Sequence, residues 1–184
     1  MNHADHVQLL EPAGLSAGGE WADLGAGRGA FTLALRELIG PQAVIHAIDQ
    51  DRRALKDLEG EYRARFRGAN GLILLAKDIS RPVGLPLLDG VLMANSLHFF
   101  NDHGRMLRLV ASMLKPGGIL LLVEYNVDSG NPWVPYPLSF RTFSTLASRS
   151  GFEAPTLLAR RTSRFLREMY SASTHLGGLP SHDQ

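Results

Sequence analysis

The chain has 184 residues, 45% of them hydrophobic and 20% charged, which suits one domain with a sizeable core and excludes global disorder. The formal net charge of +1 is too small to indicate a nucleic-acid or membrane partner. The absence of cysteine excludes disulfides, thiolate zinc sites and a cysteine nucleophile. The N-terminal segment is too polar for a signal peptide. The longest purely apolar run, Ile119 to Val123, is too short to span a membrane, so we expect a soluble cytoplasmic protein.

Short apolar runs alternate with helical patterns over most of the chain. The expected strands cover residues 21–25, 43–49, 71–78, 89–95 and 118–125. Apolar residues at helical spacing predict helices around 31–39, 55–66, 106–114 and 140–146. Two prolines between the third and fourth strands leave room for a short helical turn at most. His3 and His6 are expected to lie in a frayed N-terminal arm.

The last two apolar segments, 154–161 and 164–173, are separated only by Thr162 and Ser163. A parallel crossover needs about a dozen residues, so these segments must form an antiparallel hairpin. The alternation before them indicates a parallel, doubly wound sheet with helices on both faces. The sequence therefore predicts an α/β fold with a seven-stranded, mostly parallel sheet that ends in an antiparallel hairpin.

Polar residues gather at the carboxyl ends of the expected strands, where doubly wound sheets bind ligands. The stretch from Asp23 to Phe31, DLGAGRGAF, would place a glycine turn before a helix N-terminus, which is an anion site. A pyrophosphate in that turn would meet the Asp23 carboxylate, at a cost of roughly 4 kcal/mol for like charges about 4 Å apart at an effective dielectric of about 20. A ligand that carries both an ammonium and a carboxylate, such as the methionine moiety of S-adenosylmethionine, avoids this conflict.

Five segments in order resemble the motifs of class I S-adenosylmethionine-dependent methyltransferases. They are WADLGAGRGAF, HAIDQD, AKDI, LPLLDGVLMANSLHFF and MLKPGGILLLVEY. The resemblance covers roughly residues 3–172 and includes the closing hairpin. It implies one S-adenosylmethionine-binding, Rossmann-like domain over residues 1–184, with a core of about 3–172.

The resemblance also implies the cofactor, S-adenosylmethionine, and its product, S-adenosylhomocysteine. Asp49 would accept hydrogen bonds from both ribose hydroxyls, and Asp78 from the adenine amino group. The residues expected to bind the cofactor are Asp23, Gly25, Ala26, Gly27, Gly29, Asp49, Gln50, Asp78, Ile79 and Asn95.

The loops after the fourth and fifth strands are expected to form the acceptor side. The candidates are Ser96, His98, Phe99, Glu124, Tyr125, Asn126, Trp133 and Tyr136. His98 is the candidate general base; the alternative, which we favour from the sequence, is a histidine that packs under the cofactor or pairs with the backbone. Trp133 and Tyr136 lie among three prolines and either line the pocket or hold the loop against the sheet.

Methyl transfer from a sulfonium needs positioning more than a fixed catalytic set. The leading hypothesis is transfer to a small molecule, because NSLHFF replaces the Asn/Asp-Pro-Pro-aromatic motif of the nucleic-acid amino-methylating enzymes. The alternatives are a catalytically idle assembly subunit, an RNA or protein methyltransferase, and a nicotinamide-dependent oxidoreductase, which Asp23 and the hairpin disfavour. We expect no metal, no nucleic acid and no membrane partner. The chain offers no long lid, so an open pocket, a large substrate, and a second copy or partner subunit completing the site remain alternatives.

Overall fold

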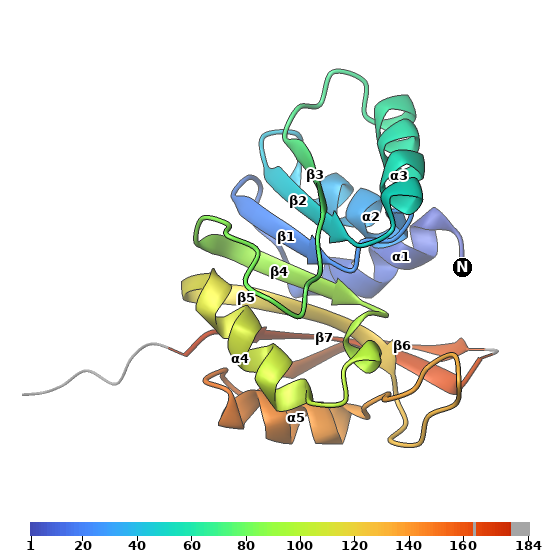
Figure 1. Ribbon diagram of the computed structural model, residues 1–184, viewed down its shortest axis with the longest axis vertical. Helices are drawn as coiled ribbons and strands as arrows, with labels where there is room; N and C mark the ends of the chain where they lie inside the picture. Colours follow the sequence, from blue (N-terminus) through green and yellow to red (C-terminus); the bar gives the residue numbers. More distant parts are fainter. Residues whose placement is uncertain (164, 178–184) are drawn as a thin grey trace, which may run out of the picture.

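In the part of the chain that the structure describes, seven strands form one sheet in the order β3-β2-β1-β4-β5-β7-β6 (Figure 1). The computed structural model describes residues 1–163 and 165–177. The strands are β1 (Glu20–Leu24), β2 (Val44–Asp49), β3 (Leu72–Ala76), β4 (Leu88–Ala94), β5 (Leu114–Tyr125), β6 (Thr156–Ser163) and β7 (Arg167–His175). Strands β1 to β5 pair in parallel, whereas β7 is antiparallel to both β5 and β6. The predicted doubly wound sheet with its closing hairpin is confirmed.

Helices cover both faces of the sheet (Figure 1). One face carries α1 (His3–Leu10), α2 (Ala30–Ile39) and α3 (Arg52–Arg65), and the other carries α4 (His103–Met113) and α5 (Phe140–Arg149). Two 3-10 turns, η1 (Glu11–Ala13) and η2 (Leu97–Phe99), follow α1 and β4. Strand order reverses between β1 and β4, so the loop after β1 lies at the topological switch point, where such sheets bind ligands.

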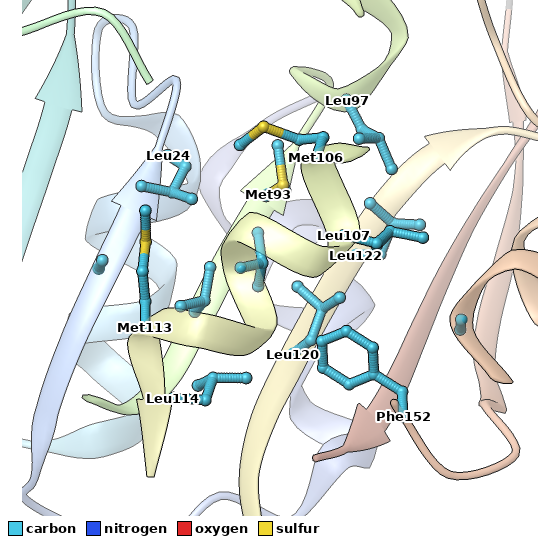
Figure 2. Packing of buried hydrophobic residues seen from close by; sticks show 14 of the residues in the cluster. Leu24, Met93, Leu97, Met106, Leu107, Met113, Leu114, Leu120, Leu122 and Phe152 are labelled. Carbon is cyan, nitrogen blue, oxygen red and sulfur yellow. The ribbon is translucent and has the colours of Figure 1, made fainter. Parts of the chain in front are cut away.

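The core is divided between the two faces by the alternation of side chains along the strands. On β5, Leu120 and Leu122 pack with the residues of α4, whereas Leu121 and Val123 pack with those of α1 and α2. All four are fully buried, and each such side chain contributes about 1.5–3 kcal/mol relative to exposure. Figure 2 shows the α4 side of this core, with Met106, Leu107 and Met113 of the helix facing the strands.

The connection between β3 and β4 contains no helix over residues 77–87, in agreement with the two prolines (Figure 1). Lys77 Nζ donates to the carbonyl of Val83 at 2.7 Å and helps to hold this connection in place. Ile73, on the edge strand β3, is 40% exposed. This end of the sheet is therefore less completely covered than the centre.

Two of the turns expected from the sequence differ in the structure. Strand β5 begins at Leu114 rather than at residue 118, because Leu114 pairs with Leu88 before the KPGG segment and Ile119 pairs with Gly90 after it. The expected turn is thus an irregularity within the pairing of β4 and β5. In the hairpin, Thr162 and Ser163 belong to β6 and pair with β7, so the reversal comes after them. Residue 164 of that reversal lies outside the described residues.

The expectation of a frayed N-terminal arm is wrong. Asn2 accepts from Asp5 N at 3.0 Å, and the Asp5 carboxylate accepts from Asn2 N at 2.8 Å, which forms a capping box at the start of α1. Asp5 also pairs with Arg161 of β6 at 2.5 Å, and Leu9 and Leu10 are buried. An eight-residue helix is marginal alone, so these tertiary contacts stabilise it.

Candidate functional site

The glycine loop between β1 and α2 approaches its neighbours too closely for side chains. A Cβ on Gly25 would lie 2.5 Å from Ser96 Cβ, and one on Gly29 would lie 2.0 Å from Leu58 Cδ1. Both residues also have positive φ angles, +82° and +83°. No side chain within residues 1–163 and 165–177 caps α2, so the backbone N–H groups at its N-terminus remain available to an anionic ligand group.

Asp49 ends β2 directly beside this loop. Its Oδ2 accepts from Gly27 N at 2.8 Å, and its Oδ1 accepts from Asp51 N at 2.9 Å. A carboxylate has about four lone-pair sites, so acceptor capacity remains for hydroxyl groups of a ligand. Asp49 therefore fixes the shape of the glycine loop and also presents a carboxylate to the space beside it.

A cavity of about 360 Å³ opens at the carboxyl edge of the sheet. Its lining residues are Gly25, Asp49, Gln50, Lys77, Ile79, Asn95, Ser96, Phe99 and Phe100. This volume is within the usual range for small-ligand sites. The structure thus brings together residues from the ends of β1, β2, β3 and β4. Lys77 and Phe100 are not among the residues expected from the sequence, although Lys77 directly adjoins Asp78 and Phe100 directly adjoins Phe99.

Two residues after β4 shape the floor of the cavity. Asn95 has a positive φ of 54°, which is uncommon outside glycine, and its Oδ1 is buried without a hydrogen-bond partner in the described chain. Ser96 Oγ donates to Leu24 O at 2.7 Å and ties this turn to the end of β1. The Asn95 amide oxygen is therefore an acceptor that a ligand could satisfy.

Asp23 does not line the cavity. It is 1% exposed, and its Oδ2 accepts from Thr32 Oγ1 at 2.6 Å. Burial raises the pKa of Asp23 to about 7; the Asp49 charge adds to this increase and the Thr32 hydrogen bond opposes it. Asp23 is therefore only partly ionised near neutral pH, and the like-charge argument against a pyrophosphate is weaker there than the sequence alone indicates.

The remaining cofactor candidates lie around the cavity rather than on its wall. Ala26, Gly27 and Gly29 form the loop itself. Asp78 is exposed; the backbone N–H of Ser80, 2.9 Å away, lowers its pKa, and Gln50 Nε2 lies 3.5 Å from it. Asp78 is therefore placed at the rim, next to Ile79 on the wall.

On the acceptor side, His98 and Glu124 form a buried pair. The His98 Nδ1 atom lies 3.0 Å from both carboxylate oxygens of Glu124, and the two side chains are 4% and 0% exposed. Glu124 also accepts from the backbone N–H groups of His98 and Tyr125, each at 3.1 Å. The pair joins the turn after β4 to the end of β5.

Aromatic side chains surround this pair and reach the surface. The His98 ring lies 4.4 Å from the Phe99 ring and 5.9 Å from the Tyr125 ring, and Tyr125 lies 6.3 Å from Phe165. Phe99, Tyr136 and Phe165 are 59%, 46% and 55% exposed. We call Phe99, Tyr125, Tyr136 and Phe165 the aromatic surface.

The proline-rich loop is held beside this surface by its backbone. Tyr136 N donates to His98 O at 3.0 Å, and the Tyr136 carbonyl is 2.9 Å from His103 Nε2. Trp133 is 74% exposed and so does not hold the loop against the sheet. Asn126 uses both ends of its amide within the protein: its Nδ2 donates to Glu168 at 2.6 Å, and its Oδ1 accepts from Phe140 N at 3.0 Å.

Within residues 1–163 and 165–177, no group of three or more His, Cys, Asp or Glu side chains is arranged to hold a metal ion. None of the helices in the described part of the chain is long and apolar enough to cross a membrane.

Comparison with known proteins gives a consistent result. Residues 22–120 match the family model described as "Methyltransferase domain". The chain is 28% identical over 104 residues to the ubiquinone/menaquinone biosynthesis C-methyltransferase UbiE of Wigglesworthia glossinidia brevipalpis, covering 56% of this chain and 42% of that protein. It spans roughly half the length of the curated relatives it matches.

Solved structures share the fold over nearly the whole chain. The YcgJ protein of Bacillus subtilis superimposes with a TM-score of 0.77 at 13% identity, covering 96% of this chain and 100% of that one. Magnesium protoporphyrin IX methyltransferase from Synechocystis PCC 6803, solved with bound SAM, gives a TM-score of 0.70 at 15% identity and covers 94% and 77% of the two chains. At these identities the likeness concerns the fold.

Proposed function

This chain belongs to the methyltransferase-domain family, and we propose that it transfers the methyl group of S-adenosylmethionine to a small-molecule acceptor. The observation that carries the proposal is the cavity at the switch point, where the glycine loop, the Asp49 carboxylate and the turn after β4 meet. The curated relatives named as C-methyltransferases support an acceptor of small size. The continuous sheet from β1 to β7 supports one domain with a core of about residues 3–172.

We propose that different chemical groups of the protein bind different parts of the cofactor. The backbone N–H groups at the start of α2 meet the methionine carboxylate, and Asp49 accepts from the ribose hydroxyls with charge-assisted hydrogen bonds. The wall residues Ile79 and Phe100 provide apolar surface for the adenine ring. The unpartnered Asn95 Oδ1 is an acceptor for the methionine ammonium. Together these contacts hold the cofactor with its sulfonium methyl facing the acceptor side.

The reaction itself is a displacement at the methyl carbon. The acceptor must lie in line with the carbon–sulfur bond and lose its water, so positioning contributes much of the rate. The exposed aromatic surface leaves the acceptor side open in the single chain. We propose that either the acceptor itself or a second subunit covers it, which light scattering with and without cofactor would distinguish.

Calorimetry of S-adenosylhomocysteine binding tests the proposal. Asp49→Ala should cost about 2–4 kcal/mol of affinity, since it removes two charge-assisted bonds and loosens Gly27. Glu61→Ala, which also removes one negative charge but from the exposed face of α3, is the control and should bind like the parent. Tighter binding of NAD than of S-adenosylhomocysteine would overturn the proposal. Cofactor binding without methyl transfer to any acceptor pool would favour the idle-subunit alternative.

A further inference from the structure

The surroundings of Glu124 fix the tautomer of His98. Glu124 is fully buried, and its carboxylate accepts from the backbone N–H groups of His98 and Tyr125 whatever the imidazole does. A carboxylate only accepts hydrogen bonds, so the facing Nδ1 of His98 must carry its proton. In the neutral ring the other nitrogen, Nε2, then has the lone pair. Within the described residues Nε2 has no hydrogen-bond partner.

The position of the pair connects it to the cavity. His98 lies in η2 between Ser96 and Phe99, which both line the cavity, and its ring packs on the Phe99 ring at 4.4 Å. The other titratable groups close to the pair come from three elements: His103 of α4, Tyr125 of β5 and Tyr170 of β7. Burial lowers the pKa of His103 and raises the pKa values of both tyrosines. Burial thus favours the neutral forms of all three.

The aromatic surface adds information about the acceptor. Phe99 and Phe165 are more than half exposed, and Tyr125 connects Phe165 to the His98 ring. Aromatic side chains prefer offset or edge-to-face contact with other rings, so this surface suits a planar aromatic molecule. A base is needed only when the nucleophile has a proton to lose. A ring that carries a hydroxyl group meets both conditions.

We propose that His98 is the general base for a phenol-type acceptor and that Glu124 is the residue that positions it; this inference rests on the proposed function. The phenol proton moves to His98 Nε2 as the phenol oxygen forms its bond to the methyl carbon. The carbon–sulfur bond breaks with its electron pair left on sulfur, which gives neutral S-adenosylhomocysteine. The imidazolium, stabilised by Glu124, then returns its proton to water. This assignment replaces the packing role that the sequence alone favours.

The test uses 4-nitrophenol as a probe, with the protein saturated by S-adenosylhomocysteine, because the phenolate form absorbs visible light and the phenol form does not. We expect bound probe to ionise at a pH at least about one unit below that of free probe, as for an acid beside a group that becomes its counter-ion. His98→Gln and Glu124→Gln should abolish this shift while S-adenosylhomocysteine still binds. His46→Gln, which changes another buried histidine of the sheet, should retain it.

The other possible results of the probe experiment contradict the proposed roles of His98 and Glu124. A shift that persists in His98→Gln, an unshifted midpoint in the parent, or no probe binding at all would overturn the proposal. Nitrogen-15 NMR of the parent provides a second measurement in case Glu124→Gln fails to fold: an Nε2–H tautomer at His98 in neutral protein would also overturn it. A parent protein that does not bind S-adenosylhomocysteine would reject the proposed function and this inference with it, whereas a parent that binds S-adenosylhomocysteine without shifting the probe rejects the base assignment alone.

Discussion

Two histidine–glutamate pairs with buried imidazole rings lie in the same sheet, at opposite ends of its strands. His46 Nε2 is 2.5 Å from Glu20 at the amino end of β1, and His98 Nδ1 is 3.0 Å from Glu124 at the carboxyl ends of β4 and β5. The two histidines are 6% and 3% exposed. Contact distance and histidine burial are therefore similar in the two pairs. These two quantities do not distinguish a pair that only stabilises the fold from a pair that takes part in a reaction.

What separates them is the environment of the carboxylate and the position in the sheet. Glu124 is fully buried and accepts from two backbone N–H groups besides the imidazole, whereas the Glu20 side chain is 28% exposed. His46 Nδ1 is buried without a partner in the described chain, so that ring has no nitrogen facing a ligand. Ser96 and Phe99, close to His98 in the turn after β4, line the cavity, whereas none of its described lining residues adjoins His46 in the chain. A site is therefore identified by the space beside the unpartnered nitrogen rather than by the pair itself.

The largest expected effect comes from removing the more buried carboxylate. Glu124→Ala should lower the free energy of unfolding by about 3–5 kcal/mol, because it leaves the imidazole and two backbone N–H groups without their acceptor. Urea denaturation measures this loss. Glu153→Ala, at an exposed position, is the control and should stay within about 0.5 kcal/mol of the parent. A loss below about 1 kcal/mol for Glu124→Ala would show that the two pairs are energetically alike.

The buried carboxylate of Asp23 extends the comparison, because few hydrogen-bond donors face it. Among the described residues Asp23 accepts from the Thr32 hydroxyl alone, and its folded pKa of about 7 exceeds the ordinary value of 3.8. Between these values the folded protein holds more protons than the unfolded chain. The free energy of unfolding should therefore fall as pH rises from about 4 to about 7, by up to about 1.4 kcal/mol per pH unit, and then level off.

Asp23→Asn should remove this pH dependence. Asparagine keeps an acceptor for Thr32 and carries no charge, but its buried amide group offsets part of the gain. We expect the variant to be about 2–3 kcal/mol more stable than the parent at pH 8 and of similar stability at pH 5. Thermal unfolding at the two pH values measures the difference. Equal stabilisation at both values would mean that the Asp23 charge is not the cause.

The two halves of the site also differ in how far the sequence predicts them. The glycine loop and Asp49 follow from local motifs, because the loop acts through its backbone and the strand end fixes the position of Asp49. The pairing of His98 with Glu124 does not, because 26 residues separate them and the contact forms only when β4 and β5 align. The sequence named both residues as candidates on the acceptor side and did not connect them.

The fold shows the same division between local and long-range information. Alternation of apolar runs predicts the sheet and its hairpin, since the pattern repeats in every element. Helix α1 was missed because eight residues give a weak pattern, although Asn2 and Asp5 form a readable capping pair. The start of β5 was missed because pairing with Leu88, rather than composition, extends the strand to Leu114.

The smallest expected effect comes from the pair at the amino end of β1. Glu20→Ala removes one contact from a side chain that is 28% exposed, so solvent already screens the interaction. Water can reach the space that the carboxylate leaves and hydrogen-bond to His46 Nε2. We therefore expect a loss of about 1 kcal/mol in urea denaturation, and less in 1 M salt, where the screening length falls to about 3 Å. His46 Nδ1 lacks a partner before and after the change, so it contributes nothing to the difference. A loss of 3 kcal/mol or more, independent of salt, would place Glu20 in the same class as Glu124 and remove the energetic distinction between the two pairs.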